Sequence, residues 1–132
     1  MTSDNLFVYG TLMRGFDHPM AKLLSANADF LGAAQCRGRL YLIKHYPGLV
    51  TAGGPAGIVH GELFRLRAPA ILLREFDMYE ACGGGFAPPT EYVRELLPVT
   101  LADGSASEAW TYVYNWPVAE LPLIASGKFL EH

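Results

Sequence analysis

The sequence predicts an α+β fold, a small mixed and mostly antiparallel β-barrel with short flanking helices, in a single domain over residues 1–132. Two observations lead to this prediction. About six segments have strand character, and they follow one another without long helical crossovers, which favours antiparallel neighbours over a parallel sheet. Only two short segments have helical spacing, so the helices can flank a curled sheet without enclosing it.

The N-terminal part predicts a strand, a helix and a long strand region. Residues 6–9 are apolar and read as a strand, and residues 19–25 read as a short helix because proline suits a first helical turn. Residues 30–43 combine aromatic and aliphatic positions with Gly32 and Gly38. Glycines within a strand pattern indicate bends or bulges, so this region is either one long bent strand or a pair of strands.

A turn and a second helix separate the middle strands. Tyr-Pro-Gly at residues 46–48 predicts a turn before a short strand at residues 49–50. Residues 58–66 alternate as a strand does. Pro69 begins the second helix, whose apolar positions keep helical spacing until the glycines at 83–85 end it.

The C-terminal part predicts a hairpin. Residues 92–101 and 108–114 read as its two strands, and Asp103-Gly104 is a turn signal between them. Residues 115–132 read as irregular, with room for one more short strand.

The composition excludes several classes of protein. Hydrophobic residues make up 51% and charged residues 17% of the chain, with a formal net charge of -3, which is typical of a compact globule. No run of Lys or Arg exists, so we expect no nucleic-acid partner. No apolar stretch is long enough to cross a membrane, and no signal-peptide pattern opens the chain. We expect a soluble, cytoplasmic protein, whose oligomeric state the sequence leaves open.

The cysteines and histidines do not form a ligand pattern. Cys36 and Cys82 are far apart and belong to no paired motif, so we predict two free buried thiols. No histidine has another His or Cys at a spacing typical of zinc sites, so we predict no metal. The glycines at 83–85 lack the Lys-Ser/Thr of a phosphate loop, and we predict no nucleotide or other cofactor.

The first candidate site is the turn that follows the first strand, Tyr9-Gly10-Thr11-Leu12. Gly10 has two readings. It can be a structural exit from the strand, or it can let backbone N–H groups approach a ligand closely.

The second candidate site is the end of the second helix, where Asp77 and Glu80 lie three residues apart in "FDMYE". Both carboxyls could be solvated at a helix end. An acid near a helix C-terminus, however, meets the negative end of the helix dipole, which raises its pKa and suits a general base.

These stretches combine with others into a family resemblance. The chain resembles the gamma-glutamylcyclotransferase-like family, which includes the gamma-glutamylamine cyclotransferases and AIG2-like proteins, from about Leu6 to Phe129. The resemblance rests on these motifs in order: "VYGTLMRG", "GRLYLI…YPGLV", "VHGELFRL", "FDMYE", "YVRELLPV", "AWTYVYN" and "IASGKF".

The resemblance implies a barrel and an enzyme that releases 5-oxoproline and a free amine from a small gamma-glutamyl substrate. The α-amine would attack its own side-chain amide, so neither a protein nucleophile nor a metal is required. Glu80 would be the acid–base residue, and the turn at residues 9–12 would be the substrate loop. Its N–H groups would hold either the developing oxyanion or the α-carboxylate. The alternative is a non-catalytic module that binds a small metabolite or a protein.

Further residues are weaker candidates. Tyr112 and Tyr114 could line the pocket, although aromatic residues on strands are commonly core. Tyr92 could help to seat the substrate, and Arg14 could pair with a substrate carboxylate. We expect Asp77 to be a structural hydrogen-bonding residue and not a second catalyst.

Overall fold

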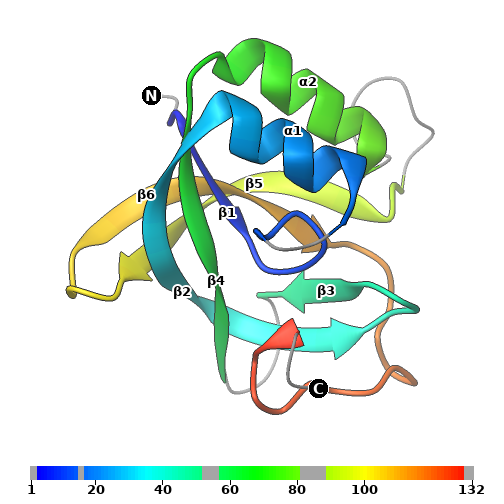
Figure 1. Ribbon diagram of the computed structural model, residues 1–132. Helices are drawn as coiled ribbons and strands as arrows, with labels where there is room; N and C mark the ends of the chain where they lie inside the picture. Colours follow the sequence, from blue (N-terminus) through cyan, green and yellow to red (C-terminus); the bar gives the residue numbers. More distant parts are fainter. Residues whose placement is uncertain (1–2, 15–16, 52–56, 81–88, 130–132) are drawn as a thin grey trace.

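The computed structural model describes residues 3–14, 17–51, 57–80 and 89–129. The two helices lie side by side over one end of a six-stranded sheet (Figure 1). The predictions for Cys82 and for the glycines at 83–85 concern residues outside these ranges. In chain order the elements are β1 (Asn5–Val8), α1 (Pro19–Asn27), β2 (Ala28–Leu42), β3 (Pro47–Val50), β4 (Gly57–Leu66), α2 (Pro69–Tyr79), β5 (Tyr92–Leu101) and β6 (Ala106–Tyr114).

The sheet closes into a barrel through its first strand. Five strands form the ring in the order β1, β4, β2, β3 and β6, which closes where Leu6 of β1 pairs with Trp110 of β6. The β1–β6 and β3–β6 pairings are parallel, whereas the other pairings are antiparallel. Strand β5 lies outside the ring, along β6. The predicted α+β, mostly antiparallel barrel with short flanking helices is therefore confirmed.

Strand β2 is the continuous element of the barrel wall. It runs over 15 residues, and its register against β4 shifts between Phe30 and Gly32, where Gly32 has a φ of 138°. That backbone conformation favours glycine, and it bends the strand. Strand β2 pairs with β4 over residues 28–38 and with β3 over residues 39–42. Of the two predicted alternatives, the single long bent strand is the one observed.

The turn predicted at residues 46–48 is wrong for two of its three residues. Strand β3 begins at Pro47, which suits a first strand position because proline has no N–H to donate. Gly48 lies directly against Tyr114, since an added Cβ would be only 2.8 Å from the Tyr114 Cβ atom. The glycine here permits close packing of two strands instead of marking a turn.

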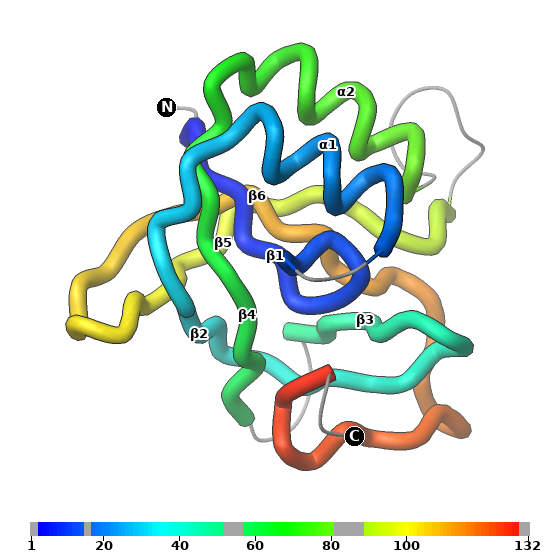
Figure 2. Tube along the Cα trace, in the orientation of Figure 1, coloured from blue at the N-terminus to red at the C-terminus, as the bar shows by residue number. Residues whose placement is uncertain are grey.

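Other boundaries differ by a few residues. Helix α2 ends at Tyr79, before the glycines predicted to end it, and β6 begins two residues earlier than predicted, at Ala106. The last described segment follows the end of β2 (Figure 2): Leu42 donates its N–H to the Pro122 carbonyl at 2.9 Å, and Ile124 donates to the Leu40 carbonyl at 2.7 Å. A single bridge replaces the further short strand that the sequence allowed.

Strand β1 is buried on both faces. Leu6, Phe7 and Val8 are each at most 3% exposed, which explains why the strand is apolar without alternation. The chain therefore leaves β1 at Tyr9 from the middle of the core, and the residues that follow lie between the barrel and the two helices (Figure 1).

Candidate active site

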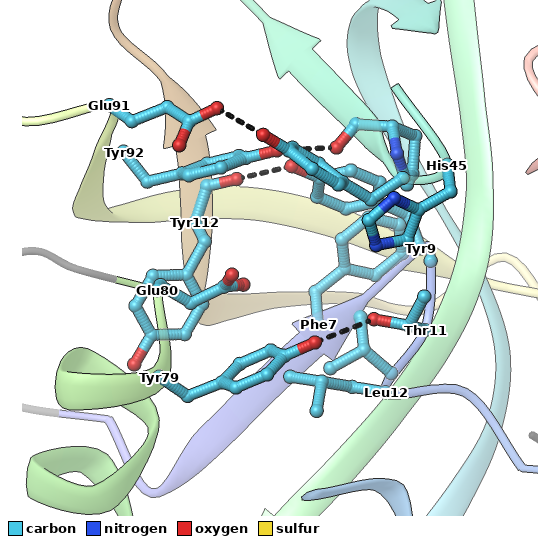
Figure 3. Close-up of a pocket in the computed structure, with 14 residues that line it drawn as sticks. Phe7, Tyr9, Thr11, Leu12, His45, Tyr79, Glu80, Glu91, Tyr92 and Tyr112 are labelled. Atoms are coloured by element: carbon cyan, nitrogen blue, oxygen red, sulfur yellow. Dashed lines mark hydrogen bonds between the residues drawn. The ribbon is translucent and has the colours of Figure 1, made fainter. Parts of the chain in front are cut away.

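Most of the predicted site residues line one cavity of about 230 Å³ (Figure 3). Its walls come from β1 and the turn after it, from the start of β3, from the end of α2 and from the β5–β6 hairpin. The lining residues are Phe7, Val8, Tyr9, Gly10, Thr11, Leu12, His45, Tyr46, Pro47, Tyr79, Glu80, Glu91, Tyr92 and Tyr112.

The turn after β1 is compact and rests on β3. Met13 donates its N–H to the Gly10 carbonyl at 3.0 Å, and a Cβ on Gly10 would lie 2.8 Å from Pro47 Cγ. Gly10 does not have a positive φ, so this close contact is the reason for glycine. Within the described part of the chain, the N–H groups of Gly10, Thr11 and Leu12 donate to no partner. They are donors that an anionic ligand group can use.

Tyr9 anchors the turn to the barrel. Its hydroxyl donates to the Tyr112 carbonyl and accepts the Leu49 N–H at 3.1 Å, so one phenol joins the end of β1 to β6 and β3. Burial raises the pKa of this hydroxyl far above its ordinary value. Tyr9 therefore shapes the cavity as a neutral, fixed wall.

Glu80 is the carboxyl that faces the cavity (Figure 3). It caps α2, and its N–H donates to the Phe76 carbonyl at 2.8 Å. No hydrogen bond from a described residue reaches its carboxylate. Burial, followed by the negative charge of Glu91, raises its pKa from 4.5 to about 7. Such a group exchanges protons readily near neutral pH, as a general acid–base residue must.

Asp77 faces a different set of partners. Arg94 donates from Nε to Oδ1 at 2.8 Å and from a terminal nitrogen to Oδ2 at 3.1 Å, and the Tyr112 hydroxyl donates to Oδ1 at 2.7 Å. These bonds join α2 to β5 and β6. The geometry agrees with the structural role predicted for Asp77.

Tyr79 connects the two helices with the turn after β1. His18 Nδ1 accepts the Met20 N–H at 3.1 Å, so the neutral ring carries its proton on Nε2, which lies 3.2 Å from the Tyr79 hydroxyl. That hydroxyl lies 3.4 Å from Thr11 Oγ1. The contacts of Tyr79 with His18 and Thr11 fix one side of the cavity, and both Thr11 and Tyr79 line it.

The far wall of the cavity contains residues that the sequence analysis missed. The Tyr46 hydroxyl donates to Glu91 Oε2 at 2.6 Å, and the Tyr92 hydroxyl donates to the Pro47 carbonyl at 2.7 Å. Glu91 directly precedes the predicted strand at residues 92–101. Its place beside Tyr92, a weak candidate, was the only feature of the sequence that could have indicated a role in the site. Nothing local in the sequence relates Tyr46 to Glu91.

Two candidates lie outside the cavity lining. Tyr114 packs its ring edge against Tyr92, with ring centroids 5.4 Å apart, and so supports the wall from behind. Arg14 donates its N–H to Glu62 at 2.8 Å, and its guanidinium lies over the Phe30 ring. Its side chain is 52% exposed, and its Nε lies 3.6 Å from Glu62 Oε2.

The described ranges contain neither a metal-binding cluster nor a membrane-spanning helix. No group of three or more His, Cys, Asp or Glu residues there could hold a metal ion. Neither helix there has the length and apolar character to cross a bilayer. Cys36 is a buried free thiol, as predicted, and burial raises its pKa to about 11.

Comparison with known proteins identifies the family. Residues 6–131 match the family described as "Gamma-glutamyl cyclotransferase, AIG2-like". The gamma-glutamylcyclotransferase family protein YtfP of Escherichia coli K12 is 36% identical over 129 residues, which cover 96% of each chain. The chain therefore belongs to the gamma-glutamyl cyclotransferase, AIG2-like family.

Solved structures share the fold. The solution structure of ytfP from Escherichia coli has a TM-score of 0.59 at 34% identity, over 96% of each chain. An AIG2-like protein from Mus musculus has a TM-score of 0.69 at 26% identity, covering 93% of this chain and 86% of that one. YkqA from Bacillus subtilis has a TM-score of 0.74 at 23% identity, and this chain spans 41% of its length.

Proposed function

We propose that the protein is a gamma-glutamyl cyclotransferase that releases 5-oxoproline and a free amine from a gamma-glutamyl amine or peptide. The observation that carries this proposal is the Glu80 carboxylate, which faces the cavity without a hydrogen-bond partner among the described residues, opposite the turn at Gly10–Leu12. Family membership supports the reaction class.

The first step is loss of a proton from the α-ammonium group of the substrate. Glu80 accepts this proton, for which a pKa of about 7 is suitable because the carboxylate is then basic yet still able to return the proton. The neutral α-amine attacks the side-chain amide carbon and forms a C–N bond that closes the five-membered lactam. Both reacting groups belong to one molecule, so orientation replaces a protein nucleophile.

The second step is departure of the amine. The carbonyl oxygen holds negative charge after attack, and the bond from its carbon to the leaving nitrogen then breaks. Glu80 delivers its proton to that nitrogen, and the second proton of the ring nitrogen passes to the released amine, which departs as an ammonium ion and leaves the neutral lactam. The N–H groups of Gly10, Thr11 and Leu12 supply donors for the α-carboxylate or for the oxyanion, and aromatic side chains form much of the cavity wall.

The test is a comparison of Glu80→Gln with the wild-type protein. Glutamine keeps the size of the side chain but cannot carry the proton, so release of 5-oxoproline from a panel of gamma-glutamyl amines and peptides should fall by roughly 10²–10⁴-fold. Ligand affinity and the circular dichroism spectrum should not change.

Glu75→Gln is the matched control, because Glu75 is an exposed acid on the same helix and should leave turnover unchanged. Full turnover in Glu80→Gln would refute the role of Glu80. A folded wild-type protein that turns over no member of the panel would favour the alternative, a non-catalytic binding module.

A further inference from the structure

The cavity has different electrostatic character at its two ends. Thr11 and Leu12 of the turn, whose N–H groups have no partner among the described residues, lie on one side of the cavity, and Glu91 lies on the opposite side, with the Glu80 carboxyl also facing the cavity (Figure 3). The described lining residues include no Lys or Arg. The ionisable side chains of the lining, apart from its tyrosines, are the carboxyls of Glu80 and Glu91 and the imidazole of His45, which packs against the Tyr46 ring.

Glu91 is held in place and keeps one oxygen available. Its Oε2 accepts the Tyr46 hydroxyl at 2.6 Å, and its backbone carbonyl accepts the Asn115 N–H at 2.7 Å. The Tyr46 ring is itself wedged between His45 and Tyr92, with centroid distances of 5.2 and 6.3 Å. Oε1 of Glu91 accepts no hydrogen bond from any described residue. The carboxylate is thus a fixed acceptor with free capacity.

This polarity orients a gamma-glutamyl substrate. The α-carboxylate of the substrate is repelled by Glu91 and is satisfied by the N–H donors, so it belongs at the Gly10–Leu12 end. The amide that reacts belongs at Glu80. The leaving amine, which extends from the other side of that amide, is then directed towards Glu91 and Tyr46.

We propose that Glu91, positioned by Tyr46, selects the leaving amine and favours gamma-glutamyl compounds whose amine carries a second, positively charged group. A cation there gains a charge-assisted hydrogen bond to Oε1, whereas a carboxylate there meets the like charge of Glu91. The inference rests on the proposed cyclotransferase function and adds the chemical class of the released amine.

Three synthetic substrates test it. They are gamma-glutamyl amides of 1,5-diaminopentane, hexylamine and 6-aminohexanoate, which place an ammonium, a methyl and a carboxylate group on the same five-carbon spacer. In the wild-type protein we expect kcat/KM to fall in that order, by about tenfold per step, the equivalent of one good charged hydrogen bond. In Glu91→Gln the ammonium and methyl compounds should agree within roughly twofold.

Matched variants separate selection from general damage. Glu95→Gln removes an exposed acid of β5, the strand that directly follows Glu91, outside the cavity, and should keep the wild-type order. Tyr46→Phe keeps the Glu91 charge but frees it from its donor, and should reduce the advantage of the ammonium compound without removing it. The order of kcat/KM for the three substrates in the wild-type protein tests the proposal even where a variant fails to fold.

A binding measurement separates this inference from the proposed function. Calorimetric titration of Glu80→Gln with the same three amides should give the same order of Kd values. If turnover or binding showed no charge preference, the inference about Glu91 would be overturned and the proposed function would stand. Charge-selective binding without turnover in the wild-type protein would support Glu91 and contradict the reaction. Absence of both binding and turnover would overturn both.

Discussion

Asp77 and Glu80 are two carboxyls at the same helix end, and their surroundings give them opposite properties. Asp77 accepts two hydrogen bonds from Arg94 and one from Tyr112, and it ties α2 to the β5–β6 hairpin. Glu80 accepts none from the described residues and faces a cavity that it shares with another acid. The helix terminus alone therefore does not make an acid functional. The two carboxyls differ in that Asp77 pairs with the Arg94 guanidinium, whereas no described cation pairs with Glu80.

The largest effect on stability should come from breaking the structural member of the pair. Asp77→Ala leaves the half-buried Arg94 guanidinium and the Tyr112 hydroxyl without their shared acceptor, so we expect a loss of about 2–3 kcal/mol in the free energy of unfolding. Chemical denaturation measures it. Glu75→Ala on the same helix should change the value by less than about 0.5 kcal/mol. Equal losses in both variants would show that the Asp77 contacts contribute nothing specific.

Glu80, the carboxyl that faces the cavity, should make the free energy of unfolding depend on pH. Its pKa is about 7 in the folded protein and 4.5 ordinarily, so the folded state holds the proton that the unfolded state releases. The contribution of this proton to the free energy of unfolding is complete below pH 4.5 and is lost as the pH rises through about 7.

Denaturation of the wild-type protein and of Glu80→Gln at pH 5 and pH 8 tests this sign. From pH 5 to pH 8, the free energy of unfolding of Glu80→Gln should rise relative to that of the wild type by on the order of 2 kcal/mol. A constant difference across this range would mean that Glu80 keeps an ordinary pKa in the folded state.

A smaller effect should appear in the pH dependence of activity, given the proposed function. Glu80 must be ionised to accept a proton, so kcat/KM should rise with pH through about 7. Glu91→Gln removes a negative charge that raises the pKa of Glu80, and this acid limb should move to lower pH. Movement to higher pH, or none at all, would show that Glu91 does not act on Glu80 electrostatically.

The fold was predictable because its signals are local. Strand patterns, proline at two helix starts and the Asp103-Gly104 turn each act over a few residues, and the structure retains them. The boundaries at Pro47 and Gly48 were not predictable, since the contact of Gly48 with Tyr114 joins residues far apart in the chain. A glycine chosen for close packing looks, in sequence, like a glycine chosen for a turn.

The candidate site was predictable only where a motif marked it. Glu80 and the turn at Gly10 belong to recognisable stretches, whereas the Tyr46–Glu91 pair depends on the closure of the barrel. Tyr114, in contrast, was predicted to line the pocket but is not among the lining residues. Residues two apart on a strand share a face, which made Tyr112 and Tyr114 equal candidates, but only Tyr112 lines the cavity, whereas Tyr114 packs against the Tyr92 ring.

The Tyr9 phenol has a consequence for ligand capture. Because it links the end of β1 to both β3 and β6, the donor turn cannot shift without disturbing the barrel wall. The backbone positions of residues 9–12 should therefore differ little between the ligand-free and ligand-bound protein. The empty protein already holds this wall in its final shape, so little of the binding free energy is lost in ordering it.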